Sequence, residues 1–200
     1  MKSKTFASIL AIVLCAVVST AWAQAPDNAW HHNFEVTSAT FSNGGTLPLN
    51  TVWNQCTAYP GGLDQSPQLS WKNAPHGTRS FVVVTYDVTA SFTHWGMYNI
   101  SSKVNSLPLN AGVAGSSFGL QVSNDFGDIS YDGPCPPTTL NPTTHQYVFT
   151  VYALDVVLPK LPTLGDFSPG AEQLYHALLA AARGGHILDS ASITGFFPNK

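Results

Sequence analysis

The sequence predicts a mainly β protein that is rich in loops, and three observations support this. Segments 81–86 and 148–154 are unbroken runs of β-branched, aromatic and aliphatic residues, as in buried strands. The chain has 16 Gly and 14 Pro, which favour turns. Only 10% of its residues are charged, against about 25% in an average globular domain. The length suits one domain with a sizeable core, and we find no internal repeat or linker.

Shorter patterns predict the remaining strands in chain order. Alternating apolar and polar residues indicate strands over 34–41, 67–71, 97–100 and 193–197. A long Gly-, Ser- and Asn-rich loop is expected over 105–125.

One helix is predicted near the end of the chain. Ser168 suits the N-cap and Pro169 the first turn, and apolar residues recur at helical spacing over 171–183. Gly184 and Gly185 end this pattern. The sequence also allows a further short helix over 186–192.

Residues 1–23 have the pattern of a bacterial signal peptide. Lys2 and Lys4 precede a short apolar run over 9–18, and residues 21–23 form a small-x-small cleavage site. The apolar run is too short for an ordinary membrane span. We therefore expect a periplasmic or secreted protein with no membrane span in its mature chain. An N-terminal core helix is the alternative interpretation.

Charge excludes two classes of partner. Without Lys2 and Lys4, 6 Lys and Arg remain of the 8 in the full chain, against 11 Asp and Glu, a formal charge of −5. An acidic chain with no basic cluster binds nucleic acid or an anionic membrane surface poorly.

Two cysteines, Cys56 and Cys135, remain beyond the predicted signal peptide. An even pair in an exported protein predicts a disulfide. A free redox pair is the alternative, although no CxxC spacing supports it. We find no zinc-binding pattern.

Three polar residues are candidates for a site. Asp87 follows the strand over 81–86, and His94 stands seven residues later. His145 stands where a proline-rich loop, which includes residues 133–137, leads into the strand over 148–154. We expect the loop and the strand ends to bring these side chains together. The alternative is a proline-stiffened turn with a surface histidine.

These residues belong to an ordered set of motifs that resembles the phosphatidylethanolamine-binding protein family, in its bacterial Raf-kinase-inhibitor-like branch. The resemblance spans about residues 34–197. The motifs are SPQLSW at 66–71, GTRSF at 77–81, Asp87 with His94-Trp95, NDFG at 124–127, YDGPCPP at 131–137, HQYVFTVYALD at 145–155, GHIL at 185–188 and Thr194-Gly195.

The resemblance implies a fold of two antiparallel sheets with Greek-key connections and a C-terminal helix. We accordingly assign residues 24–33 to an N-terminal tail and residues 34–200 to the family's domain. It also implies a small pocket for anions such as phosphate, acetate or phosphorylethanolamine head groups. The residues that match this pocket are Asp87, His94, Gly133, Pro134, His145 and Tyr147, with Tyr131 at the rim.

Two positions depart from the family pattern. The second carboxylate of its first motif is Thr89 here, and its His-Arg pair is His145-Gln146. The loss of one acid and one base suits a deleted ion pair, and it puts the identity of the ligand in doubt. The connection from Asp87 to His94 also looks short for the family.

We therefore expect an exported, non-catalytic protein that binds a small anion or a phosphate head group, without cofactor or metal. One alternative is a protein-inhibitor module that acts on a protease or kinase. Another is a hydrolase that uses Asp87, His94 and His145, and a third is a polar cluster in the core with no ligand. The sequence leaves the oligomeric state open.

Overall fold

We describe a computed structural model of the chain that covers residues 33–137, 143–162 and 170–199. The predicted signal peptide, all but the last residue of the predicted tail, and the predicted helix cap at Ser168 and Pro169 lie outside these residues.

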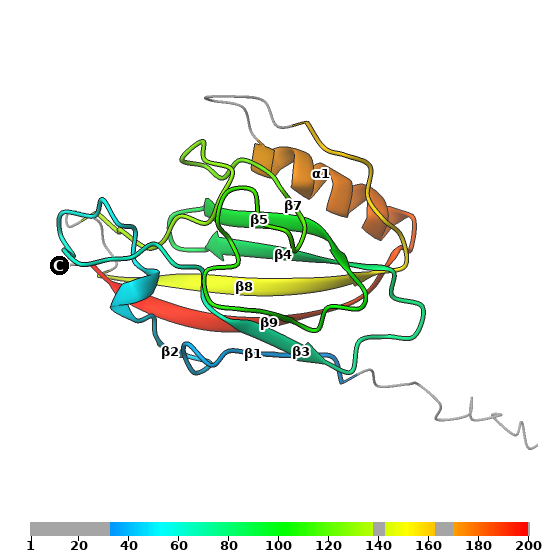
Figure 1. Cartoon of the computed structure of the whole chain (residues 1–200), viewed down its shortest axis with the longest axis horizontal. Helices are drawn as coiled ribbons and strands as arrows, with labels where there is room; N and C mark the ends of the chain where they lie inside the picture. Colours follow the sequence, from blue (N-terminus) through cyan, green and yellow to red (C-terminus); the bar gives the residue numbers. More distant parts are fainter. Residues whose placement is uncertain (1–32, 138–142, 163–169, 200) are drawn as a thin grey trace, which may run out of the picture. The chain divides into compact units, whose positions relative to one another are not determined.

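Two sheets and one C-terminal helix make up the fold, which confirms the predicted class (Figure 1). The larger sheet has the strand order β2-β9-β8-β4-β5-β7, and the smaller has the order β1-β3-β6. The larger sheet comprises β2 (Gly45–Thr46), β4 (Ser80–Asp87), β5 (Phe92–Ser101), β7 (Leu120–Gln121), β8 (Thr144–Leu154) and β9 (Ile187–Pro198). The smaller comprises β1 (Glu35–Thr37), β3 (Leu69–Lys72) and β6 (Ser106–Leu107), and a short 3-10 helix spans Leu49–Thr51. Described strand pairs are antiparallel except β2–β9, which is parallel.

Strand β4 lies between two apolar layers, which explains its unbroken hydrophobic sequence. Phe81 and Val83 pack into the core shared with the smaller sheet. Val82 and Val84 pack on the opposite face with residues of helix α1 (Gly170–Arg183). Because successive side chains of a strand point to opposite faces, both sets must be apolar.

Helix α1 covers one face of the larger sheet through Leu174 and Leu178, which are both buried. Gly96 on β5 lets the helix approach, because a Cβ there would lie 2.9 Å from a methyl group of Leu174 and 2.6 Å from one of Val122. Gly185 follows the helix with φ +72°, a conformation that glycine adopts at low cost.

Three predictions of local structure need correction. Residues 187–198 form one continuous strand, so the short helix considered over 186–192 is wrong. The reason is tertiary, because β9 pairs with β8 from Ile187 to Pro198. The first strand is also shorter than predicted, at Glu35–Thr37. The loop expected over 105–125 contains two short strands, β6 and β7.

Candidate functional site

A cavity of about 200 Å³ opens where β4 ends and where β5 and β8 begin. Adjacent strand ends supply its polar groups, and loops supply most of its apolar wall. Its lining residues are Asp87, Ala90, Phe92, His94, Phe126, Cys135, Pro136, Pro137, His145 and Tyr147.

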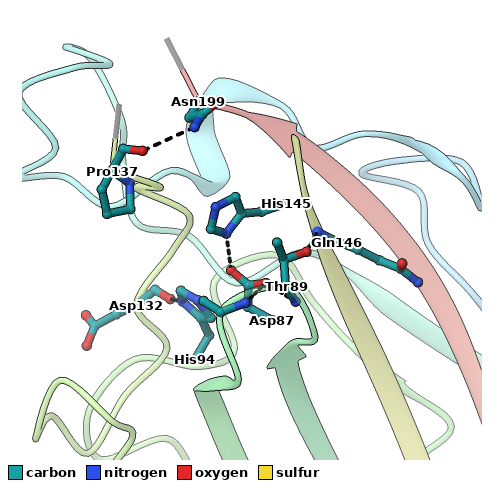
Figure 2. A network of polar contacts seen from close by, with 9 residues as sticks. Asp87, Thr89, His94, Asp132, Pro137, His145, Gln146 and Asn199 are labelled. Carbon is teal, nitrogen blue, oxygen red and sulfur yellow. Dashed lines mark hydrogen bonds and ion pairs between the residues drawn. The ribbon is translucent and has the colours of Figure 1, made fainter. Parts of the chain in front are cut away.

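Asp87 and His145 form a buried pair on neighbouring strands. Asp87 is opposite Tyr147 in the β4–β8 register, so His145 lies just beyond the end of β4. His145 Nδ1 is 2.7 Å from Asp87 Oδ2, and Figure 2 shows this contact. The other carboxylate oxygen, Oδ1, accepts hydrogen bonds from the backbone N–H groups of Thr89 (2.8 Å) and Ala90 (3.1 Å). The carboxylate is therefore held from both sides.

A β-bulge directs His94 toward the same cavity. Thr85 pairs with Trp95, but the next residue, Tyr86, pairs with Thr93, which leaves His94 as the extra residue on β5. Trp95 packs between the sheets, whereas the Thr93 hydroxyl lies 3.3 Å from a tyrosine hydroxyl on α1. The bulge thus reverses the alternation of β5 and re-aims one side chain. The sequence pattern gave no sign of it.

The ring of His94 is held by the backbone of Asp132. His94 Nδ1 lies 2.7 Å from the carbonyl oxygen of Asp132, and a carbonyl can only accept, so Nδ1 carries the hydrogen. Burial lowers the pKa of His94 below its ordinary value, and the attraction of nearby carboxylates offsets this only in part. The neutral ring with a free Nε2 is therefore favoured.

His145 differs from His94 in the partner of its Nδ1, and its Nε2 has no hydrogen-bond partner among the described residues. Its Nδ1 faces a carboxylate, while its Nε2 is buried and finds no hydrogen-bond partner among the described residues. A buried polar atom without a partner costs about 1–3 kcal/mol. Because His145 lines the cavity, this atom is the first candidate to contact a ligand.

Aromatic rings surround the two histidines. The ring centroid of His94 lies 5.1 Å from those of Phe92 and Tyr147, and 5.8 Å from that of Phe126. Burial first, and then the charge of Asp87, hold the pKa of Tyr147 well above its usual range, so its hydroxyl stays protonated. The cavity wall is therefore mainly apolar.

Sequence reasoning missed Ala90, Phe92 and Phe126 as wall residues. The motif at 124–127 was a usable signal for Phe126. The side-chain oxygen of Asn124 accepts hydrogen bonds from the N–H groups of Phe126 (2.9 Å) and Asp128 (3.1 Å). Its amide donates to the Asp132 carboxylate at 2.6 Å. Asn124 thus shapes the loop that places Phe126 beside His94.

The proline loop is cross-linked through Cys56–Cys135, which confirms the predicted disulfide. Cys135 lines the cavity together with Pro136 and Pro137. Asn199 supports the same wall, because its amide donates to the Pro137 carbonyl at 3.2 Å (Figure 2).

Gly133, Pro134 and Tyr131 lie outside the lining of the cavity. A Cβ on Gly133 would meet the carbonyl oxygen of Thr51 at 1.9 Å, so only glycine fits this crossing. The Pro134 carbonyl accepts from the N–H of Trp53 at 3.3 Å, and the Tyr131 hydroxyl donates to the Thr51 carbonyl at 3.0 Å. These residues fix the loop from behind, and the structure places Asp87, His94, His145 and Tyr147 at the cavity.

A pair of carboxyl groups, those of Asp64 and Asp132, lies behind His94, and the sequence analysis did not predict it. Burial raises the pKa of Asp132 to about 7, and the neighbouring carboxylates of Asp64 and Asp128 add to the shift. Burial also raises the pKa of Asp64, whose Oδ1 accepts from the N–H of Gly133 at 2.7 Å. This pair joins the loop around residue 64 to the proline loop.

The two positions that depart from the family pattern are in contact. The backbone N–H of Gln146 donates to Thr89 Oγ1 at 3.0 Å. The Gln146 side chain points away from His145 in Figure 2, and neither position lines the cavity. A longer side chain at this position would start in the same direction, away from His145.

The described residues contain no group of three or more His, Cys, Asp or Glu side chains arranged to hold a metal ion. No helix among them is both long enough and apolar enough to span a membrane.

Comparison with known proteins agrees with this architecture. A family model described as phosphatidylethanolamine-binding protein matches residues 37–198. A UPF0098 protein of Aquifex aeolicus is 36% identical over 170 residues, which cover 82% of this chain and 87% of that protein. The Escherichia coli UPF0098 protein YbhB is 36% identical over 162 residues, covering 78% of this chain and 94% of that protein.

Solved structures show the same relationship. The crystal structure of Escherichia coli YbcL, described as a new member of the mammalian PEBP family, has a TM-score of 0.65. It is 32% identical, and the match covers 84% of this chain and 99% of that one. The chain belongs to the phosphatidylethanolamine-binding protein family, in its bacterial Raf-kinase-inhibitor-like branch.

Proposed function

We propose that this protein binds a small oxyanion, such as phosphate or a phosphate-containing head group, between His94 and His145. Family membership implies a pocket of this kind. The observation that carries the proposal is the Nε2 atom of His145, which is buried at the cavity without a protein partner among the described residues. When the ring takes up a proton, this atom becomes a charge-assisted donor to an oxyanion.

The size of the cavity favours a head group over a larger ligand. Pockets for drug-sized molecules have volumes of about 300–1,000 Å³, whereas this cavity has about 200 Å³. The apolar wall excludes water from the hydrogen bonds that the histidines make, and such bonds are stronger in a dry site. We infer a ligand of a few non-hydrogen atoms at the histidines.

We expect no turnover. The Asp87–His145 pair has the geometry of an oriented general base, which is the feature that would favour a hydrolase. However, no Ser or Thr lines the cavity among the described residues, and Cys135 is bound in the disulfide. Binding without chemistry suits this wall better.

Export is part of the proposal. A disulfide that closes a separation of 79 residues supports it, because such bonds persist mainly in oxidising compartments. Inhibition of a protease or kinase remains a prediction, to be tested by capture with the immobilised protein.

Calorimetric titration tests the binding proposal. Phosphorylethanolamine and inorganic phosphate are titrated into the wild type, His145→Ala and His186→Ala at about pH 5.5 and about pH 8, either side of the ordinary imidazole range. We expect tighter binding at the lower pH. His145→Ala should weaken binding about ten- to hundredfold through loss of a charge-assisted hydrogen bond, and His186→Ala should bind like the wild type. Equal binding by all three proteins would place the anion elsewhere.

A further inference from the structure

The two histidines of the cavity have different partners at Nδ1. His94 Nδ1 faces a neutral backbone carbonyl, and His145 Nδ1 faces the Asp87 carboxylate. In both rings the hydrogen on Nδ1 is fixed by an acceptor, so ligand contacts fall to the two Nε2 atoms. What each Nε2 offers then depends on whether its ring takes up a second proton.

His94 is built to stay neutral. The rings of Phe92, Phe126 and Tyr147 surround it, and burial lowers its pKa. The titratable groups that act on it are Asp87, Asp125 and His145, and the Asp132 carbonyl holds its other nitrogen. A neutral ring with hydrogen on Nδ1 leaves a lone pair on Nε2, which can only accept.

His145 is held by a carboxylate, whereas His94 is held by a carbonyl. The Nδ1–H of His145 points at a carboxylate that two backbone N–H groups hold in place. A carboxylate in this position stabilises an imidazolium, as in other histidine–carboxylate pairs. With hydrogens on both nitrogens, the ring donates from Nε2.

Apart from the hydroxyl of Tyr147, which stays protonated, the rest of the wall supplies few donors. Among the described lining residues there is no Lys or Arg, and Pro136 and Pro137 have no N–H. The N–H of Ala90 is already bonded to Asp87. A ligand with only acceptor oxygens would leave the His94 lone pair buried without a partner, which is costly.

We propose that the cavity selects oxyanions that carry one acidic hydrogen: His145 donates to a ligand oxygen, and His94 accepts the ligand's hydroxyl hydrogen. The inference rests on the proposed function and names its ligand class. Phosphate monoesters have such a hydrogen below their second pKa of about 6, whereas phosphodiesters and sulfate esters have none. The preferred ligand is therefore a free head group or another monoester, and an intact phospholipid is disfavoured.

Three small monoanions test this selection at about pH 5, where a phosphate monoester is mostly singly charged. Methyl phosphate carries a hydroxyl hydrogen, whereas methyl sulfate and dimethyl phosphate have the same charge and none. We expect methyl phosphate to bind at least about tenfold more tightly than either, the value of one such hydrogen bond. Phosphorylethanolamine, a monoester, should likewise bind more tightly than glycerophosphorylethanolamine, a diester. This comparison distinguishes the free head group from the head group as it is linked in a phospholipid.

Variants assign the two roles. His94→Phe keeps a ring among its aromatic neighbours but removes the acceptor. The affinity of this variant for methyl phosphate should therefore fall to its affinity for methyl sulfate. His145→Ala should weaken all three ligands together. His94→Gln is the second variant, with an amide that donates as well as accepts, and it should bind methyl sulfate better than the wild type does.

The outcomes separate the two proposals. Equal affinity of the wild type for all three monoanions would overturn the selection and leave oxyanion binding standing. Absence of binding by any oxyanion would overturn both. Tighter binding of ethanolamine than of methyl phosphate would also overturn both, because it would make the cavity a cation site.

Discussion

Two histidine–aspartate pairs in this molecule have nearly the same geometry and different surroundings. His145 Nδ1 lies 2.7 Å from Asp87 Oδ2, and His186 Nδ1 lies 2.9 Å from Asp155 Oδ1. The side chains of the first pair are 2% and 3% exposed, and those of the second are 45% and 38% exposed. Contact distance alone therefore does not identify a binding site.

The surroundings give each pair its role. Asp155 and His186 also exchange a backbone contact, with the Asp155 N–H donating to the His186 carbonyl at 3.1 Å. This pair joins the end of β8 to the turn after α1, and water can satisfy its free nitrogen. The buried pair leaves His145 Nε2 at a cavity, where a ligand can satisfy it. The unmatched atom at the cavity distinguishes the proposed binding pair from the exposed pair.

The largest expected difference between the pairs is in stability. Asp87→Ala removes the partner of a buried imidazole and of two backbone N–H groups, so it should cost about 3–5 kcal/mol. Asp155→Ala breaks an exposed pair and should cost about 0–1 kcal/mol. Denaturant unfolding of both variants and the wild type measures this. Equal losses would show that burial does not separate the two pairs.

Reduction of the disulfide should destabilise the chain around the cavity more than the region of the exposed Asp155–His186 pair. Cys135 is part of the cavity wall, so loss of its bond to Cys56 should lower the free energy of unfolding by about 2–5 kcal/mol. Hydrogen exchange should rise around the proline loop and stay low in α1. The control is the Cys56→Ser, Cys135→Ser double variant, which should not respond to reductant. A uniform rise across the chain would contradict the local effect.

A smaller effect concerns Asp132, whose carbonyl holds His94. Its pKa is raised from 3.8 to about 7, mainly by burial, so the folded state binds more protons than the unfolded state between these values. The stability that this proton provides is complete below about pH 4 and is lost as pH rises through 7. Asp132→Asn should therefore stabilise the protein at pH 8 by about 1 kcal/mol, or 2–4 °C in melting temperature, and change little at pH 4.5. A gain in stability at pH 4.5 and none at pH 8 would contradict a raised pKa for Asp132.

The sequence predicted most of the fold because its signals were local. The apolar runs of β4 and β8 and the spacing of Leu174 and Leu178 depend on short segments. Strand β9 was partly missed because its polar first half is a strand only beside β8. Long-range pairing overrides local propensity in such a segment.

The site was predictable in its polar residues and not in its walls. Motif order was enough to single out Asp87, His94 and His145, which the structure brings to one cavity. The bulge at His94 depends on how two strands register, and no local pattern encodes that. Gly133 was assigned to the wall, yet it is needed for the close crossing at Thr51.

Nitrogen-15 spectra of the histidine side chains, recorded with and without phosphorylethanolamine at about pH 6, test the central claim most directly. In the free protein, the spectra should show a hydrogen on Nδ1 of both His94 and His145. Ligand should shift the Nε2 signals of these two rings and leave both nitrogens of His186 unchanged. A saturable titration that moves His186 as much as His145, or that moves neither cavity histidine, would contradict a binding site between His94 and His145.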